Sequence, residues 1–536
     1  MLTPPFSSVA RRACSSWLSA SLLLGSRALA QEAANPPASV PSAPVPPARA
    51  ATAPVPPPPA DLGAGEAAHA DAEADGADPP KPRWEVALSG YFRAPIMVGM
   101  SERPNPDGSG GERFQIAYAP NRVVDANYNS FSYTRLQEGD WGELYVTAKR
   151  PHVAATLAFM GYWYTWAGYE NPNAAWVPAQ AWVDLDSDFS LGALRPHVDF
   201  KGGVFWQRWG MFDKYDTYLF GRFHQAGGAL ELQLPLGPAE VRLVEGLGTN
   251  RNGIAGVGTG LTLLHYTHLG VKLGKWLDAG AYHNVSWTRD PSLFAPPTTA
   301  PVSPPPTPGP DGEPGGGPYA AAREAGMTVY GADVNLRLPH VGHAWVAASH
   351  IDVTNGWALP AIVEVMHSPG ASGIATNYLG YGEGGAGSGE LTNVALLYEN
   401  SYRGVRGQSL GMTPDLQLSV FGMLARVERD LLADALMPAR VTELKWGSDV
   451  TLKLLSWLAF MLRYDAVDLD AGGDGGAFRA VTPRVTFTSH ALSTESIWLQ
   501  YSRYFYDADV VLPTSANQPY PNPDRNVVKL QANLSF

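Results

Sequence analysis

Residues that bind metals or nucleotides occur in this chain at familiar spacings, but their surroundings do not favour such sites. His265 and His268 fall on opposite faces of an expected strand, and His340 and His343 lie in an expected turn. Neither arrangement directs two imidazoles at one metal ion. The run "GEGGAG", residues 382–387, fits G-x-G-x-x-G, but it has neither the preceding strand nor the following helix of a dinucleotide site. We interpret these residues as ordinary parts of strands and loops.

Two acidic runs are the remaining candidates for a bound ion. The runs "DLDSD", residues 184–188, and "DLDAGGD", residues 468–474, place several carboxylates on expected turns. Calcium-binding loops use carboxylates in this way. Solvated loop acids are the simpler interpretation, so we predict no resident metal.

Covalent catalysis and nucleic-acid binding are both disfavoured. The only cysteine, Cys14, lies in an N-terminal segment that we expect to be removed, so the mature chain has no thiol for catalysis, disulfides or metal binding. No G-x-S-x-G nucleophile motif occurs. The net charge is −12 and the mature part has no basic cluster, which excludes a nucleic-acid partner. We predict neither an enzyme nor a cofactor.

The N-terminal segment has the features of an export signal. Arg11 and Arg12 precede an apolar stretch, and Ala28-Leu29-Ala30 fits an A-x-A cleavage site. We therefore predict a signal peptide at residues 1–30, cleaved after Ala30. Residues 31–82 are rich in Pro and Ala and should form a disordered periplasmic linker. Residues 83–536 form the third region, whose fold is predicted in the next two paragraphs.

Strict alternation of apolar and polar residues dominates residues 83–536. At the C-terminus Val528, Leu530 and Phe536 fall on one face of an extended chain, and Lys529 and Gln531 fall on the other. Many of the polar positions are charged, which favours a water-filled lumen over a packed core. No apolar run reaches the roughly 18 residues of a membrane helix, so a membrane protein of this composition would be a closed β-barrel.

The connections between these runs alternate in length. Short turns are expected near Pro151, at 235–238, 274–275 and 339–342, and near Ser456. Long loops are expected at 101–126, 291–324, 369–389, 470–476 and 511–524. This asymmetry is typical of outer-membrane barrels. We predict an all-β, transmembrane antiparallel β-barrel of about 18 strands, with 16 as the alternative, and expect Phe536 to face lipid. The last strand resembles the C-terminal signal read by barrel-insertion machinery.

Four stretches of the first third of the barrel resemble the maltoporin family of sugar-specific outer-membrane porins. "GYFR" (residues 90–93) resembles the family's first strand, and "YTRLQEGDWGELYV" (133–146) its second and third strands. "GGVFWQRWGMFDKYDTYLFG" (202–221) resembles a strand and the inward-folded loop that narrows the pore, and "GGALELQLPLG" (227–237) the next strand.

The resemblance implies an 18-stranded trimer with pore-lining aromatic residues, arginines and acids. These would be Tyr91, Arg93, Arg135, Trp141, Glu143, Arg208, Asp216 and Tyr218. The chain departs from the family at Val177 and Pro178, where a constriction arginine is missing, and at Ser535, where the family has a tryptophan. Stacking on the aromatic residues and hydrogen bonds from charged ones would favour sugars.

The predicted function is passive diffusion of sugars or small polar solutes through the outer membrane of a Gram-negative bacterium. The predicted partners are membrane lipid, the solute, the insertion machinery and, in a homotrimer, two further copies of the chain. The alternatives are a general or anion-preferring pore, and a non-transporting barrel that serves as a structural protein, an adhesin or an enzyme.

Overall fold

The fold is known from a computed structural model of the whole chain. It describes residues 83–100, 123, 125, 131–162, 175–192, 194–217, 219, 221–249, 262–289, 324–356, 378–379, 385–407, 413–431, 438–471, 473, 475–489, 494–507 and 525–536. All of them belong to one compact unit, Ala50–Phe536. The predicted signal peptide and linker, residues 1–82, lie outside the described residues.

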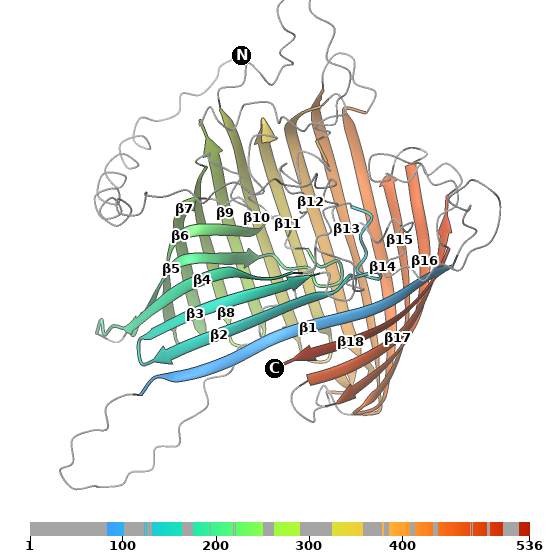
Figure 1. Cartoon of the computed structure of the whole chain (residues 1–536), viewed down its shortest axis with the longest axis horizontal. Coiled ribbons are helices and arrows are strands. Elements are labelled where there is room, and N and C mark those ends of the chain that lie inside the picture. The colour runs from blue at the N-terminus through green and yellow to red at the C-terminus, as the bar shows by residue number, and fades with distance from the viewer. Residues whose placement is uncertain are drawn as a thin grey trace, which may run out of the picture. The chain divides into compact units, whose positions relative to one another are not determined.

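A single sheet of 18 antiparallel strands closes on itself (Figure 1). The strands are β1 (Glu85–Met100), β2 (Trp141–Arg150), β3 (Val153–Tyr162), β4 (Ala175–Asp188), β5 (His197–Trp209), β6 (Gly221–Leu236), β7 (Ala239–Thr249), β8 (Leu263–Leu273), β9 (Leu277–Thr288), β10 (Ala325–Leu338), β11 (Gly342–Thr354), β12 (Gly385–Ser401), β13 (Asp415–Leu431), β14 (Arg440–Leu455), β15 (Leu458–Asp470), β16 (Gly475–Ser489), β17 (Thr494–Tyr506) and β18 (Asn526–Ser535). A short helix, α3 (Tyr402–Val405), follows β12. Among the described residues, no helix is long and apolar enough to cross a bilayer.

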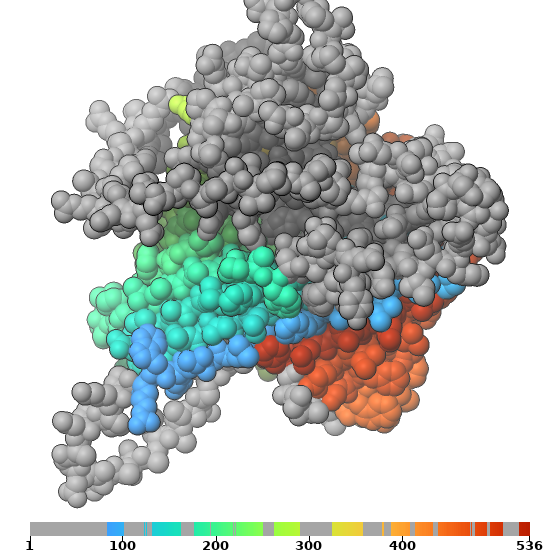
Figure 2. Space-filling model, viewed as in Figure 1, coloured from blue at the N-terminus to red at the C-terminus, as the bar shows by residue number. Residues whose placement is uncertain are grey.

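The first and last strands close the barrel. Each strand pairs with its neighbour in the chain, and β1 pairs with β18 through a register that sets Arg93 opposite Asn533 and Ile96 opposite Leu530. Figure 2 shows this seam as an unbroken surface where the blue β1 meets the red C-terminal strands. The prediction of a closed antiparallel barrel with 18 strands is confirmed, and the alternative of 16 strands is wrong.

The expected short turns occur where the sequence placed them. Turns connect the strands at residues 151–152, 237–238, 274–276, 339–341 and 456–457. Most of the residues in the expected long loops lie outside the described part. The acidic runs were wrongly expected on turns, because residues 184–188 belong to β4 and residues 468–470 to β15; Asp474 lies outside the described residues.

The outward faces of the strands are apolar. Leu530 is 45% exposed, whereas its neighbours Lys529 and Gln531 are fully buried inside the barrel, so the alternation predicted for the last strand is confirmed. Phe536 stacks on the outward-facing Phe92 with 5.9 Å between ring centroids. A closed sheet with an apolar exterior satisfies its backbone groups internally, as a hydrocarbon environment requires.

The inward faces fall into two unlike regions. Over β8–β13, which we call the apolar wall, they are mostly aliphatic and aromatic and join one large core cluster; its members include Leu264, Tyr266, Tyr282, Trp345, Leu391 and Phe421. Over β14–β18, β1 and β2, which we call the polar wall, buried charged and amide side chains dominate; they include Lys445, Arg463, Asp465, Gln500, Lys529 and Arg93. The expectation of a charged, wet lumen is therefore wrong for the apolar wall.

Candidate functional site

A β-hairpin leaves the barrel wall and enters the lumen. Pairing between β4 and β5 ends at Ala181 and Val204, and pairing between β6 and β7 ends at Ala226 and Thr249. β5 and β6 nevertheless remain paired with each other as far as Trp209 and Gly221. We call residues 205–225 the tongue; Tyr218 and Phe220 within it lie outside the described residues. Glycine is required at the point of departure, because Gly203 has φ 140° and a Cβ there would overlap the Ala181 carbonyl oxygen.

One face of the tongue packs on the apolar wall. Gln207 and Gln225 both donate a hydrogen bond to the Tyr266 hydroxyl of β8, at 3.1 and 2.6 Å. Trp209 stacks on His268 of the same strand with 4.9 Å between centroids. These contacts fix the base of the tongue against the wall beside it.

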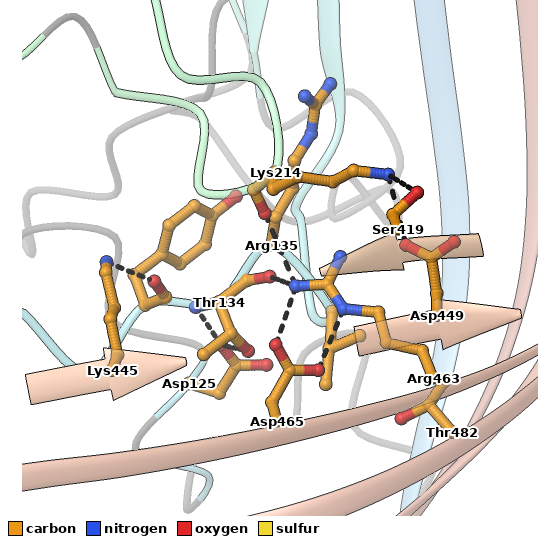
Figure 3. A network of polar contacts seen from close by, with 12 residues as sticks. Asp125, Thr134, Arg135, Lys214, Ser419, Lys445, Asp449, Arg463, Asp465 and Thr482 are labelled. Carbon is orange, nitrogen blue, oxygen red and sulfur yellow. Dashed lines mark hydrogen bonds and ion pairs between the residues drawn. The ribbon is translucent and has the colours of Figure 1, made fainter. Parts of the chain in front are cut away.

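The tip of the tongue reaches the opposite side of the barrel. Phe212 stacks on Trp345 of β11 at 5.1 Å. Beyond it, Lys214 Nζ lies 3.0 Å from an Asp449 carboxylate oxygen of β14 and 3.2 Å from one of Glu399 of β12. Its ammonium also donates to the Ser419 hydroxyl of β13 at 3.2 Å (Figure 3). One lysine thus joins the tip to three strands.

A second inward segment covers the polar wall. We call residues 131–140, the described end of the β1–β2 connection, the strap. Its backbone carbonyls accept hydrogen bonds from three wall residues: Lys445 to Tyr133 O at 3.0 Å, Arg463 to Thr134 O at 2.8 Å, and Gln500 to Leu136 O at 2.9 Å. The resemblance placed Arg135 on a strand; this is wrong, because residues 131–140 form no strand.

The strap and the tongue bring three of the predicted pore residues together around one carboxylate. Glu138 lies 3.0 Å from Arg93 Nη1 and 2.5 Å from Arg135 Nε. Asp216 at the tongue tip interacts electrostatically with Glu138, Arg135 and Arg93. The sequence prediction omitted Glu138, although its place three residues after Arg135 was a usable signal for an ion pair.

Two of these residues have unusual backbone conformations. Arg135 has φ 69° and Asp216 has φ 52°, in the left-handed region that residues with a Cβ seldom adopt. Such a conformation costs roughly 1 kcal/mol or more and persists where the surroundings enforce it. At Arg135 the restraining contacts are the hydrogen bonds that Arg463 and Gln500 donate to the flanking Thr134 and Leu136 carbonyls.

The two acids on these connections are affected oppositely by their surroundings. Burial favours the neutral form of Glu138, but the guanidinium groups of Arg93 and Arg135 outweigh it and lower the pKa of this carboxyl to about 2. Burial raises the pKa of Asp216 to about 6, and the opposing effect of Arg135 only limits the rise. Glu138 is thus a fixed anion, whereas Asp216 changes charge near neutral pH.

A second group of predicted residues surrounds Glu143 on β2. Trp141 Nε1 donates to one Glu143 oxygen at 3.1 Å, and Arg208 Nη2 of the tongue lies 3.8 Å from the same oxygen. Tyr145, which the prediction omitted, donates its hydroxyl to the other oxygen at 2.5 Å. Glu143 therefore joins the wall to the second face of the tongue.

The predicted aromatic residues form a packed cluster. Tyr91 and Trp206, the latter not predicted, pack against Trp141 and Met160, and the Tyr91 hydroxyl donates to Asn533 at 3.3 Å. The predicted Tyr218 lies outside the described residues. The side chains of Arg135 and Arg208 remain 20% and 12% exposed, while their partners Glu138 and Glu143 are 2% exposed. Water reaches the arginines rather than the acids.

Comparisons with known proteins add little to this description. No protein-family model and no curated protein matches the chain. Among solved structures it is similar to Acinetobacter baumannii OccAB1, with a TM-score of 0.40 and 11% identity over 84% of this chain and 96% of that one. It is also similar to the Acinetobacter baumannii outer membrane channel DcaP (TM-score 0.35, 11% identity, 84% and 97% covered) and to OmpT, an outer membrane protein of Vibrio cholerae (0.36, 9%, 87% and 100%). Likeness at this level carries no argument about function.

Proposed function

We propose that the chain is an outer-membrane porin of a Gram-negative bacterium that lets small polar solutes diffuse passively across the membrane. Its apolar exterior fits a lipid environment. The proposal includes removal of residues 1–30, insertion by machinery that reads the terminal strand, and association of three copies. In the proposed orientation the short turns face the periplasm, as in other outer-membrane barrels.

The observation that carries the proposal is the pair of water-accessible arginines, one on each inward segment. Arg135 on the strap and Arg208 on the tongue each lie beside a buried carboxylate, Glu138 or Glu143. Guanidinium groups offer several hydrogen-bond donors to a passing hydroxyl or carbonyl. Because each positive charge already has an anionic partner, a solute is held weakly and leaves readily, as conduction requires.

Sugars are the solute class that we favour. The partly buried Tyr91 and the buried Trp141 lie on the wall beside Glu143 and Arg208, so aromatic and polar groups occur at one place. Sugar rings bind to such surfaces through their apolar faces while their hydroxyls take hydrogen bonds. Tyr218 belongs to the same proposal through its place in the tongue.

An anion-preferring pore is the second candidate, and the polar wall favours it. Cationic side chains point inward from several strands of this wall: Lys445, Arg463, Arg484, Lys529 and Arg93. Among the described residues, the buried Lys529 ammonium makes no hydrogen bond. Glu443, Asp449, Asp465 and Glu143 offset part of this charge on the same wall, so Lys529 is the cation that would most raise the local concentration of anions.

Single-channel recording of the purified mature protein in planar bilayers tests these functions. We expect discrete conductance steps that oligosaccharides block at millimolar concentration. Conductance with anion preference and without sugar block would favour the second candidate. Absence of any conductance would favour a non-transporting barrel and contradict the proposal.

Four variants test the residue assignment. Arg208→Ala and Trp141→Ala should weaken sugar block, because they remove a donor and an aromatic surface. Arg242→Ala and Trp446→Ala are matched controls, since Arg242 pairs with Glu231 and Trp446 lies on the outer face. Sugar block that survives in the first pair as in the second would show that the assigned residues do not contact the solute.

A further inference from the structure

One buried side chain of the wall contacts both inward segments. Arg463, on β15, forms two parallel hydrogen bonds with Asp465, each 2.8 Å long. Its Nη2 atom also donates to Thr134 O of the strap at 2.8 Å and to Lys214 O of the tongue at 3.3 Å. Figure 3 shows this guanidinium between the two segments, with Asp465 beneath it.

The neighbouring contacts attach each segment separately to the same wall. The Lys214 side chain extends to Asp449 and Ser419, and Lys445 donates to Tyr133 O. Lys214 joins the tongue to the wall through its own side chain, and Lys445 hydrogen-bonds to the strap alone, although its ammonium also lies 4.2 Å from the centroid of the Tyr215 ring of the tongue. Arg463 donates hydrogen bonds to both segments.

The acceptors on the segments are backbone carbonyls, so Arg463 restrains the positions of the strap and tongue backbones. A carbonyl bond restrains the chain itself, whereas a side-chain bond leaves rotamers free to adjust. Arginine suits this place because its planar group carries five donors in a fixed fork. Hydrogen bonds of an ionised group in a water-poor site are stronger than neutral ones.

We infer that Arg463 is a positioning residue that couples the strap to the tongue. The strap carries Arg135 and the tongue carries Arg208, so the spacing of these two arginines is set from the wall by a residue that solute does not contact. The consequence for solute passage rests on the proposed function. The mechanical coupling does not, and it can be tested without transport.

The test removes Arg463 together with Asp465, because deleting one partner would strand a buried charge. In Arg463→Met/Asp465→Leu both groups become apolar at similar volume, and the barrel should fold. The matched control is Arg242→Met/Glu231→Leu, which removes another inward-facing arginine–carboxylate pair, one that bonds within β6 and β7 and to neither inward segment. Retained far-UV strand signal and heat-modifiable gel migration check folding in both.

Hydrogen–deuterium exchange of the detergent-solubilised mature protein is the first readout. We expect exchange in residues 131–140 and 210–217 to rise together by about tenfold in the Arg463 variant and to stay unchanged in the control. Loosening of one segment alone, or of neither, would overturn the inference. If the double variant does not fold, Arg463→Lys keeps the ion pair but lacks the fork, and the same joint rise is required of it.

Single-channel recording is the second readout. Conductance of the Arg463 variant should rise by about twofold with larger open-channel noise, because the strap and the tongue are no longer held at a fixed distance from each other. Unchanged conductance and noise, beside a control that also conducts normally, would contradict the coupling. If wild-type protein does not conduct, the proposed function fails while the exchange measurement still decides whether Arg463 couples the segments.

Discussion

The apolar wall and the polar wall have the same backbone architecture but differ in what their inward side chains do. On β8–β13 they bury aromatic and aliphatic groups against the tongue, as a soluble protein does in its core. On β14–β18, β1 and β2 they form hydrogen bonds and ion pairs with the strap. One half of the barrel interior therefore serves mainly as a core, and the other holds the groups that could meet solute.

The two walls should respond differently to substitution. Apolar burial is non-directional and contributes about 1.5–3 kcal/mol for each large side chain. The apolar wall should therefore tolerate conservative changes and lose stability in proportion to the side-chain volume that a substitution removes. A buried charge depends on its partner, and removing that partner leaves an unpaired charge behind. Single changes on the polar side should therefore alter charge and geometry more than volume.

Truncation in the core half should have the largest effect on stability. Phe223 of the tongue is fully buried and packs on Trp209 and Tyr266. Phe223→Ala should lower the free energy of unfolding by about 3–5 kcal/mol, because it loses burial and leaves a cavity. Urea unfolding in detergent measures this. Phe460→Ala on the outer face is the control, and an equal loss there would show that the apolar wall is not a core.

Removal of Glu138 should have the next largest effect, on selectivity as well as on stability. Glu138→Gln leaves Arg93 and Arg135 without their shared anion, so the free energy of unfolding should fall by about 2 kcal/mol. The reversal potential under a salt gradient should shift toward anion preference, because the constriction gains net positive charge. Glu231→Gln is the control, because Glu231 bonds to Arg242 and Gln233 and to neither inward segment. A reversal potential that moves equally in both would remove Glu138 from the pore.

The strand pattern was the part of the fold that could be predicted from sequence. Over most of β14 and β18 apolar and polar residues alternate, and because the pleat fixes a period of two, the inner face follows directly. The turns and the outward-facing place of Phe536 depend on equally local signals. On the apolar wall the signal disappears: in β12, inward Ala395 and Leu397 adjoin outward Val394 and Leu396. A strand that is apolar on both faces does not show which face is inside.

The candidate site could be predicted only in part. The resemblance selected Arg93, Arg135 and Asp216, which the structure groups around Glu138, and Trp141, Glu143 and Arg208, which it groups together as well. The resemblance did not indicate which residues hold the tip of the tongue against the wall. Lys214 and Asp449 are 235 positions apart in sequence, and no local pattern indicates that a connection between β5 and β6 will reach β14.

A smaller, pH-dependent effect should come from Asp216. Its pKa is raised to about 6, above its value in an unfolded chain, so protonation favours the folded state. The stability that it contributes is present at low pH and is lost as the pH rises through 6. The groups that interact with it are Glu138 and Arg135 on the strap, Arg93 on β1 and Arg222 on β6.

The Asp216 effect can be measured in two ways. Between pH 8 and pH 5 the reversal potential should shift toward anion preference as one negative charge is lost, and Asp216→Asn should abolish this step. Because Asn mimics the neutral acid, the variant should match wild-type stability only below the unfolded pKa of 3.8 and should exceed it at pH 8. A variant that titrates like wild type would assign the step to another group.

The smallest effect on stability and ion selectivity should come from an exposed ion pair at the ends of two strands. Lys149 and Glu85 lie 3.8 Å apart at the ends of β2 and β1, with side chains 55% and 73% exposed. Water screens such a pair, so Lys149→Met should change the free energy of unfolding by less than about 1 kcal/mol and leave the reversal potential unchanged. The same urea and bilayer measurements apply. If the reversal potential of Lys149→Met shifted as much as that of Glu138→Gln, ion selectivity would depend on the total charge of the protein. Buried and exposed ion pairs would then have the same effect.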